Sequence, residues 1–260
     1  MIQMRHQQIL EILSQQQTAS VSELSDQLAV SAVTIRADLN QLAEDGQVVR
    51  THGGARLAKE SKRQEQSFAM RQQFNADAKR RIGRLAASFV SPGESILLDA
   101  STTAVAVGQA LKEMPQLDNI TVVTTGIWTA LELLGAPHIN VVLGGGQVRN
   151  TSGSIAGVIT NEILERFNFS KAFLGAWGID IEEGLTDSPL MEVELKRVII
   201  QNSREIIAVV DGSKFDRLGL ASYAAPEQIQ RIITDETAPP DMLTAFAAKG
   251  IDVCVAQAGS

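Results

Sequence analysis

The chain has 260 residues, of which 44% are hydrophobic and 4% are aromatic, and its formal net charge is -7. This length allows two domains, the few aromatic residues favour the aliphatic core of a parallel α/β sheet, and the acidic balance argues against indiscriminate nucleic-acid binding. A single cysteine, Cys254, excludes an internal disulfide, and the lack of a secretory leader or of an apolar run near about 18 residues predicts a cytoplasmic protein that does not span a membrane.

The first predicted feature is a pair of short helices joined by a tight turn between Leu24 and Leu39. Ser22 can cap the first helix and Ser31 the second. Helical spacing of apolar residues defines a buried face on the second helix, formed by Ile35, Leu39 and Leu42. Its outer face would present four polar residues, Ser31, Thr34, Arg36 and Asn40. This arrangement inserts a recognition helix into the major groove of DNA.

A β-prone run over residues 47–55 follows and turns at Gly53 and Gly54. The pattern predicts the wing of a winged helix-turn-helix, in which Arg50 would contact DNA. His52 would either contact a backbone phosphate or cap the turn of the wing. Residues 1–63 carry equal numbers of basic and acidic side chains, so the placement of the arginines supports DNA binding more than their number does. The alternative is a small helical module that contacts another protein.

Residues 58–75 are polar and glutamine-rich, which predicts a linker between a first domain over 1–57 and a second domain over 76–260. From Asp77 onward, predicted helices alternate with short buried strands. The strands are expected over residues 95–98, 120–123, 139–143, 172–174, 206–210 and 251–255, and the helices near 103–113, 127–134, 157–166, 191–202 and 241–248. Such alternation predicts a parallel sheet that binds ligands beyond the carboxyl ends of its strands.

Polar or glycine-rich segments follow three of these predicted strands. The first contains Asp99, Ser101, Thr102 and Thr103, the second contains Thr124, and the third contains Gly145 and Gly146. Backbone amides at the start of a helix can hold a phosphate together with hydroxyl groups, although serine or threonine can also simply cap the helix. Three such strand ends in series predict a binding cleft.

Two later segments of the chain also carry paired charged residues. Lys214 follows a strand that ends near Asp211, where its ammonium group would suit the phosphate or carboxylate of a sugar derivative. Glu192 and Lys196 lie four residues apart on a predicted helix, and a surface ion pair is expected for them.

The segments Val30–Leu39 and Val49–Ala55 together resemble the DeoR family of bacterial sugar-metabolism regulators, and the resemblance extends over nearly the whole chain. It implies a winged helix-turn-helix followed by a parallel-sheet α/β sensor domain that is similar to ribose-5-phosphate isomerase and glucosamine-6-phosphate deaminase. The effector site is then expected to comprise Asp99, Ser101, Thr102, Thr103, Thr124, Gly145, Gly146, Trp177 and Lys214.

The chain departs from the family pattern at four positions. Ala37 stands where a second basic residue is usual, which is expected to weaken phosphate contact or to narrow the operator preference. Thr125 and Gly126 stand where the family commonly has Asn-Ser. Trp177 stands where it often has Asp, so a carboxylate is replaced by an apolar wall and the effector is not fixed by the resemblance.

The sequence thus predicts a repressor of a carbohydrate-utilisation operon that binds double-stranded operator DNA as a homodimer or homotetramer. A phosphorylated sugar or a related metabolite would bind the second domain and lower the affinity for paired half-sites, and no cofactor or metal is expected. One alternative is an aldose-ketose phosphate isomerase fused to a DNA-binding module, with Asp99, Asp180 or Glu192 as the base, although fold similarity does not carry activity with it. Another is an oligomeric ligand-binding scaffold whose first domain contacts protein.

Overall fold

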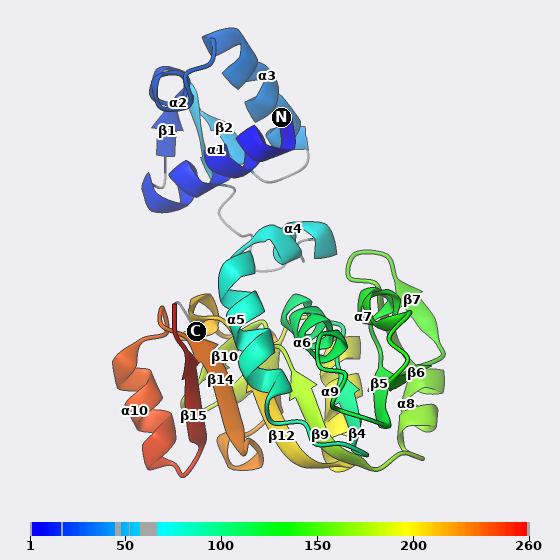
Figure 1. Cartoon of the computed structure of the whole chain (residues 1–260). Helices are drawn as coiled ribbons and strands as arrows, with labels where there is room; N and C mark the ends of the chain where they lie inside the picture. The colour runs from blue at the N-terminus through cyan, green and yellow to red at the C-terminus, as the bar shows by residue number, and fades with distance from the viewer. Residues whose placement is uncertain (1, 17, 45–47, 52, 58–66, 259–260) are drawn as a thin grey trace. The chain divides into compact units, whose positions relative to one another are not determined.

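The computed structural model describes residues 2–16, 18–44, 48–51, 53–57 and 67–258. The chain divides into two compact units, Met1–Gln64 and Glu65–Ser260, each with its own apolar core (Figure 1). The division falls inside the polar segment 58–75. Within the described ranges, no helix is long and apolar enough to cross a membrane.

The first unit combines helices with a small antiparallel sheet. Its described elements are α1 (Ile2–Gln16), β1 (Thr18–Ser20), α2 (Val21–Leu28), α3 (Ala32–Glu44), β2 (Val48–Thr51) and β3 (Gly54–Leu57), and the strands pair in the order β1-β3-β2. Apolar side chains from all three helices meet in one core, which includes Ile9, Leu13, Leu24, Ile35, Leu39 and Leu42. The β2–β3 hairpin is the expected wing, so the predicted winged helix-turn-helix fold is confirmed.

Helix α2 begins with a reciprocal pair of hydrogen bonds. The backbone N–H of Glu23 donates to Ser20 Oγ at 3.1 Å, and the backbone N–H of Ser20 donates to Glu23 Oε2 at 2.7 Å. The expectation that Ser22 caps this helix is wrong. Ser20 takes the position because a glutamate three residues later can return its hydrogen bond, and Ser22 has no such partner.

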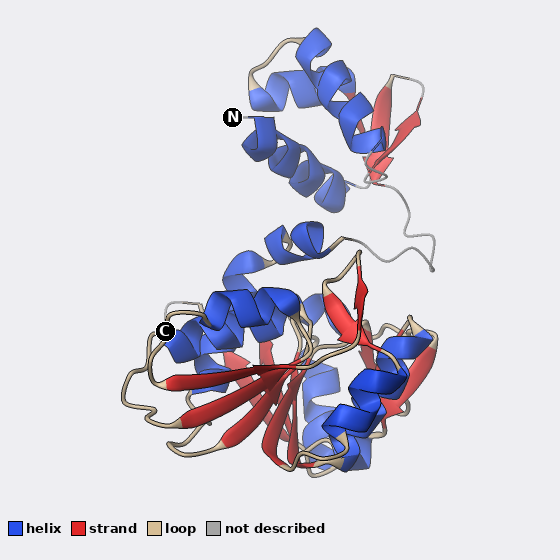
Figure 2. Cartoon of the chain, turned by 90° about the vertical axis from the view of Figure 1, so that its right-hand side faces the viewer, coloured by secondary structure: helices blue, strands red, loops and turns tan. Residues whose placement is uncertain are grey.

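Seven parallel strands form the central sheet of the second unit (Figure 2). In spatial order they are β15 (Asp252–Ala256), β14 (Arg231–Asp235), β12 (Ser203–Val209), β9 (Phe169–Leu174), β4 (Ser95–Leu98), β5 (Ile120–Thr124) and β6 (Ile139–Leu143). In chain order, β5 and β6 are added on one side of β4. The next strand, β9, pairs with the other side of β4, and β12, β14 and β15 follow it on that side. The sheet therefore has a topological switch point between β4 and β9, where parallel α/β sheets bind their ligands.

Each buried strand sends alternate side chains to the two faces of the sheet, as the two-residue period of a strand requires. In β4, Leu97 enters one core, whereas Ile96 and Leu98 enter the other. One face is covered by α5 (Ala76–Ala87), α6 (Thr102–Lys112) and α7 (Ile127–Leu133), and the other by α8 (Val158–Leu164), α9 (Leu190–Gln201) and α10 (Pro240–Ala248) (Figures 1 and 2). Burial on both faces explains why the strands are aliphatic rather than alternating.

Two small antiparallel sheets accompany the central one. The first pairs β7 (Gln147–Arg149) with β8 (Ser154–Ala156), and the second contains β10 (Gly178–Asp180), β11 (Gly184–Asp187) and β13 (Ala221–Ala224). The sequence did not predict these strands or β14. The partners of these strands in space define them, rather than a local pattern in the sequence.

The described part of the second unit begins with α4 (Phe68–Gln73), which lies within the segment expected to be a linker. Ser67 caps this helix, and the ring of Phe68 stacks on that of Trp128 with the ring centroids 5.4 Å apart. Residues 67–75 therefore pack on the second unit. The rest of the expected linker, residues 58–66, lies outside the described residues.

The close packing of α5 on α6 generates a prediction about two glycines. A Cβ at Gly83 would lie 2.4 Å from the backbone oxygen of Ala106, whereas the nearest atom to a Cβ at Gly108 would be 3.5 Å away. Gly83→Ala should lower the free energy of unfolding of this unit by about 1–3 kcal/mol, because backbone must move. Gly108→Ala should be neutral or stabilising by up to about 1 kcal/mol, because alanine favours the helix.

Denaturation followed by tryptophan fluorescence measures this difference, because both tryptophans, Trp128 and Trp177, lie in the second unit. Equal stabilities of the two variants would contradict the close helix–helix contact at Gly83.

Candidate functional site

A tight turn sets the start of α3 in the first unit. Ala29 adopts a left-handed conformation with φ of 52°, and Ser25 Oγ donates to the backbone oxygen of Val30 at 2.5 Å. The backbone N–H of Thr34 donates to Ser31 Oγ at 3.2 Å, and the two hydroxyl oxygens lie 2.9 Å apart. The expected capping of α3 by Ser31 is therefore confirmed.

The outer face of α3 lies away from the core and carries polar residues beside the exposed Val33 and Ala37. Among the residues predicted to contact DNA, Ser31, Arg36 and Asn40 are exposed and Thr34 is half-buried. Arg50, on β2, is half-buried as well, whereas His52 lies outside the described residues. A polar helix face beside a two-stranded wing is the surface that such a module presents to a major groove.

A buried carboxylate fixes α3 against α1. Asp38 accepts hydrogen bonds from Arg5 at 2.5 and 2.9 Å, and His6 Nε2 lies 3.1 Å from its second oxygen. Burial by itself would raise the pKa of Asp38, but the hydrogen bonds and charge of Arg5, with a contribution from His6, hold that pKa below its usual value. This ion pair holds α3 against α1 on the buried side of the helix.

The second unit has a pocket at the switch point of the sheet. Its lining comes from the segments that follow β4, β9 and β12 and from the α4–α5 region: Ser101, Thr102, Thr103, Gly175, Ala176, Val209, Val210, Asp211, Ser213, Lys214, Arg71, Phe74 and Lys79. The pocket offers about 50 Å³, and one water needs about 10–15 Å³. It has room for a few waters or for one small anionic group.

Positive charge dominates this pocket. Among the described residues that line it, Arg71, Lys79 and Lys214 face a single carboxylate, Asp211. Burial would raise the pKa of Asp211, but Lys214, Lys79 and two hydrogen bonds hold it below its usual value, so the carboxylate stays ionised. Burial lowers the pKa of Lys79 to about 8, with help from Lys214 and Arg71 and against the effect of Asp211.

The amino end of α6 adds to the positive charge of the pocket. Ser101 caps the helix by accepting from the backbone N–H of Ala104 at 3.1 Å, and the dipole of the helix gives that end partial positive charge. The pocket is therefore suited to an anion. Within the described ranges, no group of three or more histidine, cysteine, aspartate or glutamate residues is placed to hold a metal ion.

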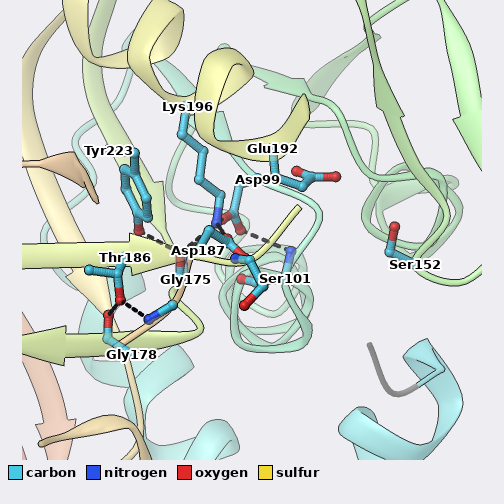
Figure 3. A network of polar contacts seen from close by, with 12 residues as sticks. Asp99, Ser101, Ser152, Gly175, Gly178, Thr186, Asp187, Glu192, Lys196 and Tyr223 are labelled. Carbon is cyan, nitrogen blue, oxygen red and sulfur yellow. Dashed lines mark hydrogen bonds and ion pairs between the residues drawn. The ribbon is translucent and has the colours of Figure 1, made fainter. Parts of the chain in front are cut away.

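A buried polar network joins the strand ends beside the pocket (Figure 3). Asp99 accepts from the backbone N–H groups of Ser101 and Gly175, each at 2.9 Å, and so bridges the ends of β4 and β9. Lys196 Nζ donates to Gly175 O and to Asp187 Oδ2, both at 2.7 Å, and lies 3.3 Å from Asp99 Oδ2. Tyr223 donates to the same backbone oxygen of Gly175 at 2.7 Å. These contacts fix one wall of the pocket.

The surface ion pair expected between Glu192 and Lys196 is wrong, because both side chains are buried. Lys196 reaches Asp187 and Asp99, and Glu192 instead accepts from Arg149 at 2.6 Å. Burial alone would lower the pKa of Lys196, but the surrounding carboxylates hold it well above its usual value. Burial raises the pKa of Tyr223, so both groups stay protonated at neutral pH.

Comparison with known proteins identifies both units. Residues 5–61 match the family described as the DeoR-like helix-turn-helix domain, and residues 74–236 match the DeoR C terminal sensor domain. The chain belongs to the DeoR family. It is accordingly a DNA-binding transcriptional regulator with a C-terminal sensor domain, rather than an enzyme.

Members of the DeoR family with curated descriptions are similar to this chain over almost its whole length. The HTH-type transcriptional regulator GolR of Listeria innocua is 36% identical, covering 97% of this chain and 98% of that protein. The glycerol-3-phosphate regulon repressor of Escherichia coli K12 is 35% identical over 91% of each chain. Among solved structures, ribose 5-phosphate isomerase A from Methanocaldococcus jannaschii is 18% identical, with a TM-score of 0.41 over 54% of this chain and 55% of that one.

The structure brings together four of the predicted effector residues of this DeoR protein, Ser101, Thr102, Thr103 and Lys214, which all line the pocket. Asp99 lies directly behind its wall. The other predicted residues lie elsewhere. Thr124 is buried and accepts from the backbone N–H of Gly126, and Gly145 and Gly146 contact Thr160 on α8. Trp177 is half-buried and donates from its backbone N–H to the backbone oxygen of Thr186. None of these four lines the pocket that the described residues form.

Sequence reasoning missed several pocket residues. Arg71, Phe74 and Lys79 lie in or beside the segment expected to be a linker, and Gly175 and Ser213 are small residues with no distinctive chemistry. The sequence signal for Arg71 and Lys79 was the regular occurrence of basic residues along a short amphipathic stretch. This signal does not distinguish a solvated surface from a pocket wall, because the strands that complete the pocket are far away in the sequence.

The ion pair between α1 and α3 generates a prediction for the first unit. Asp38→Asn should lower its free energy of unfolding by about 1–3 kcal/mol, because Arg5 loses a charged partner in a largely buried site. Because the pKa of Asp38 is lowered by folding, the wild-type stabilisation is present at neutral pH and is lost as the pH falls below about 4.

Circular dichroism of the helices measures this effect, since the first unit has no tryptophan. Asp26→Asn, a change at an exposed aspartate of α2, is the matched control and should leave stability unchanged. The same loss in both variants would contradict a specific role for the ion pair.

Proposed function

We propose that this DeoR family member represses a carbohydrate- or polyol-utilisation operon and is released from its operator by a phosphorylated sugar or a related metabolite. The observation that carries the proposal is the cationic pocket at the switch point of the sensor domain. Its three cations, one carboxylate and helix amino end suit a phosphate ester. The names of two relatives support this, since one is the glycerol-3-phosphate regulon repressor and another a putative aga operon transcriptional repressor.

We propose that the outer face of α3 and the wing contact DNA directly. Arg36 and Asn40 are exposed on the helix and would reach base edges or phosphates, with Ser31 and Thr34 at its amino end beside a backbone phosphate. Arg50 and His52 would add contacts from the wing. Ala37 carries no charge, so the helix makes one ionic contact fewer than a member with a basic residue there.

The proposal also includes assembly of two or four copies, because paired half-sites need paired recognition helices. Support comes from apolar side chains exposed in the first turns of two neighbouring helices, Val158 and Ile159 on α8 and Leu190 and Met191 on α9. Exposed apolar side chains gathered in this way are typical of surfaces that bind another protein.

Operator binding, measured by fluorescence anisotropy with the promoter fragment next to the gene, tests the proposal. The titration is repeated with glycerol 3-phosphate, with a panel of sugar phosphates and with their unphosphorylated counterparts. One phosphorylated compound should lower the operator affinity about 5- to 150-fold, the range of an allosteric coupling. Arg36→Ala should weaken operator binding by a similar factor, with Arg84→Ala, an exposed arginine of α5, as the charge-matched control.

Binding that every compound leaves unchanged would contradict the proposed effector. Equal affinities of Arg36→Ala and the wild type would contradict the proposed recognition surface.

The lowered pKa of Lys79 predicts a pH dependence of effector binding. As the pH rises through about 8, Lys79 loses its charge in the empty pocket, so the affinity for a phosphate monoester should fall between about pH 7 and 9.5. A bound anion raises that pKa, so binding near pH 8.5 should take up a proton. Calorimetry in buffers of different ionisation enthalpy measures this uptake.

The Lys79→Gln variant should bind more weakly at pH 7 and lose the pH dependence. Lys112→Gln, at an exposed lysine of α6, should retain it. A pH profile in Lys79→Gln that matches the wild type would show that another group titrates.

A further inference from the structure

Helix α4 is the first described element that follows the DNA-binding unit in the chain. Its amino end is attached to the sensor domain in two ways. The backbone N–H of Phe68 donates to the backbone oxygen of Thr151 at 2.9 Å, and the buried ring of Phe68 stacks on Trp128 with 25° between the ring planes. Neither aromatic residue is among the described residues that line the pocket.

The carboxyl end of α4 forms part of the pocket itself. Arg71 and Phe74 line it, and the ammonium group of Lys79 donates to the backbone oxygens of both, at 2.5 Å for Phe74. Asn75 turns the chain with φ of 53°, and its Nδ2 donates to Asp211 Oδ1 at 2.8 Å. The hydrogen bonds that hold this turn are therefore made with Lys79 and Asp211, which both line the pocket.

Arg71 and Lys214 act on Lys79 as like charges, since both lower its pKa. Three cations thus share one small region of the protein around Asp211. An anion among them supplies opposite charge, and a guanidinium group offers paired N–H groups that match the geometry of a phosphate.

We infer that Arg71 is a ligand-binding residue, whose guanidinium group binds the anionic group of the effector together with Lys214 and the amino end of α6. An occupied pocket then clamps α4, the helix that leads back to the DNA-binding unit. The inference rests on the proposed function, because it takes the pocket to hold an anionic effector. A ligand can shift a conformational equilibrium only through contacts that differ between the two states, and Arg71 provides such a contact on the connecting segment.

Calorimetric titration of the full-length protein with glycerol 3-phosphate and with inorganic phosphate tests the binding role. Arg71→Ala should weaken both affinities about 10- to 100-fold, and Arg71→Lys should weaken them less, because lysine keeps the charge but not the paired donors. Arg80→Ala is the matched control, since Arg80 is an exposed arginine of α5 that pairs with Asp77, and it should bind as the wild type does. Tryptophan fluorescence during thermal unfolding verifies that each variant is folded.

The outcomes separate this inference from the proposed function. Wild-type affinity in Arg71→Ala would overturn the role of Arg71 and leave the proposed effector pocket in place. If the wild type bound neither glycerol 3-phosphate nor inorganic phosphate, the proposed anion pocket would be overturned. Binding of glycerol 3-phosphate without binding of inorganic phosphate would still support the inference, provided that Arg71→Ala lost it.

Hydrogen exchange of residues 68–75 tests the clamp. Saturating phosphate should slow exchange in the wild type and in Arg80→Ala, and should leave it unchanged in Arg71→Ala. Phe68→Ala, which removes the aromatic stack and the ring 5.9 Å from the Arg71 guanidinium but keeps Arg71 itself, should exchange faster without ligand and still be slowed by it. Equal exchange with and without phosphate in the wild type would overturn the clamp.

Discussion

The buried carboxylate of Asp99 joins the ends of β4 and β9, the two strands that flank the topological switch point of the sheet. It accepts backbone hydrogen bonds from Ser101 after β4 and from Gly175 after β9, and the ammonium group of Lys196 lies beside it. A charge in this position is tolerated only with such partners, because burial without them is costly. The network leaves no room for a side chain at Gly175, where a Cβ would lie 2.5 Å from Ser101 Cβ. The pocket thus has a rigid wall before any ligand arrives.

The α4 side of the same pocket is held by fewer contacts than the Asp99 side. There the attachments are an aromatic stack, a few hydrogen bonds to backbone oxygens and one contact from Asn75, on a helix of six residues. A rigid wall facing a lightly attached one is the arrangement in which a ligand can change the position of one element and not the other. In the chain, α4 is the first described element after the DNA-binding unit, so under the proposed role of Arg71 the effector contacts this connecting segment.

Local sequence patterns were sufficient where the deciding interactions are local. The buried stripe of Ile35, Leu39 and Leu42 follows from helical spacing, and Ser31 caps α3 as expected because its partner, Thr34, is three residues away. Ser20 rather than Ser22 caps α2 because Glu23 returns its hydrogen bond, and the pattern Ser20-x-x-Glu23 is visible in the sequence. The principal strands of the sheet and four pocket residues at strand ends could likewise be predicted.

The sequence by itself determined the two-part architecture and the helix pair, because both depend on periodicity and spacing within short stretches of chain, and its motifs carried the resemblance to the family. Only the tertiary structure decided which charges are buried and with whom. Glu192 and Lys196 have the spacing of a surface pair, yet strand β11 brings Asp187 to Lys196, and β7 brings Arg149 to Glu192. Arg71 lies in the segment predicted as a linker and Lys79 just beyond it, and only the folded structure brings both to the pocket. Contacts between residues far apart in the chain leave no local pattern, so the site could be completed only in three dimensions.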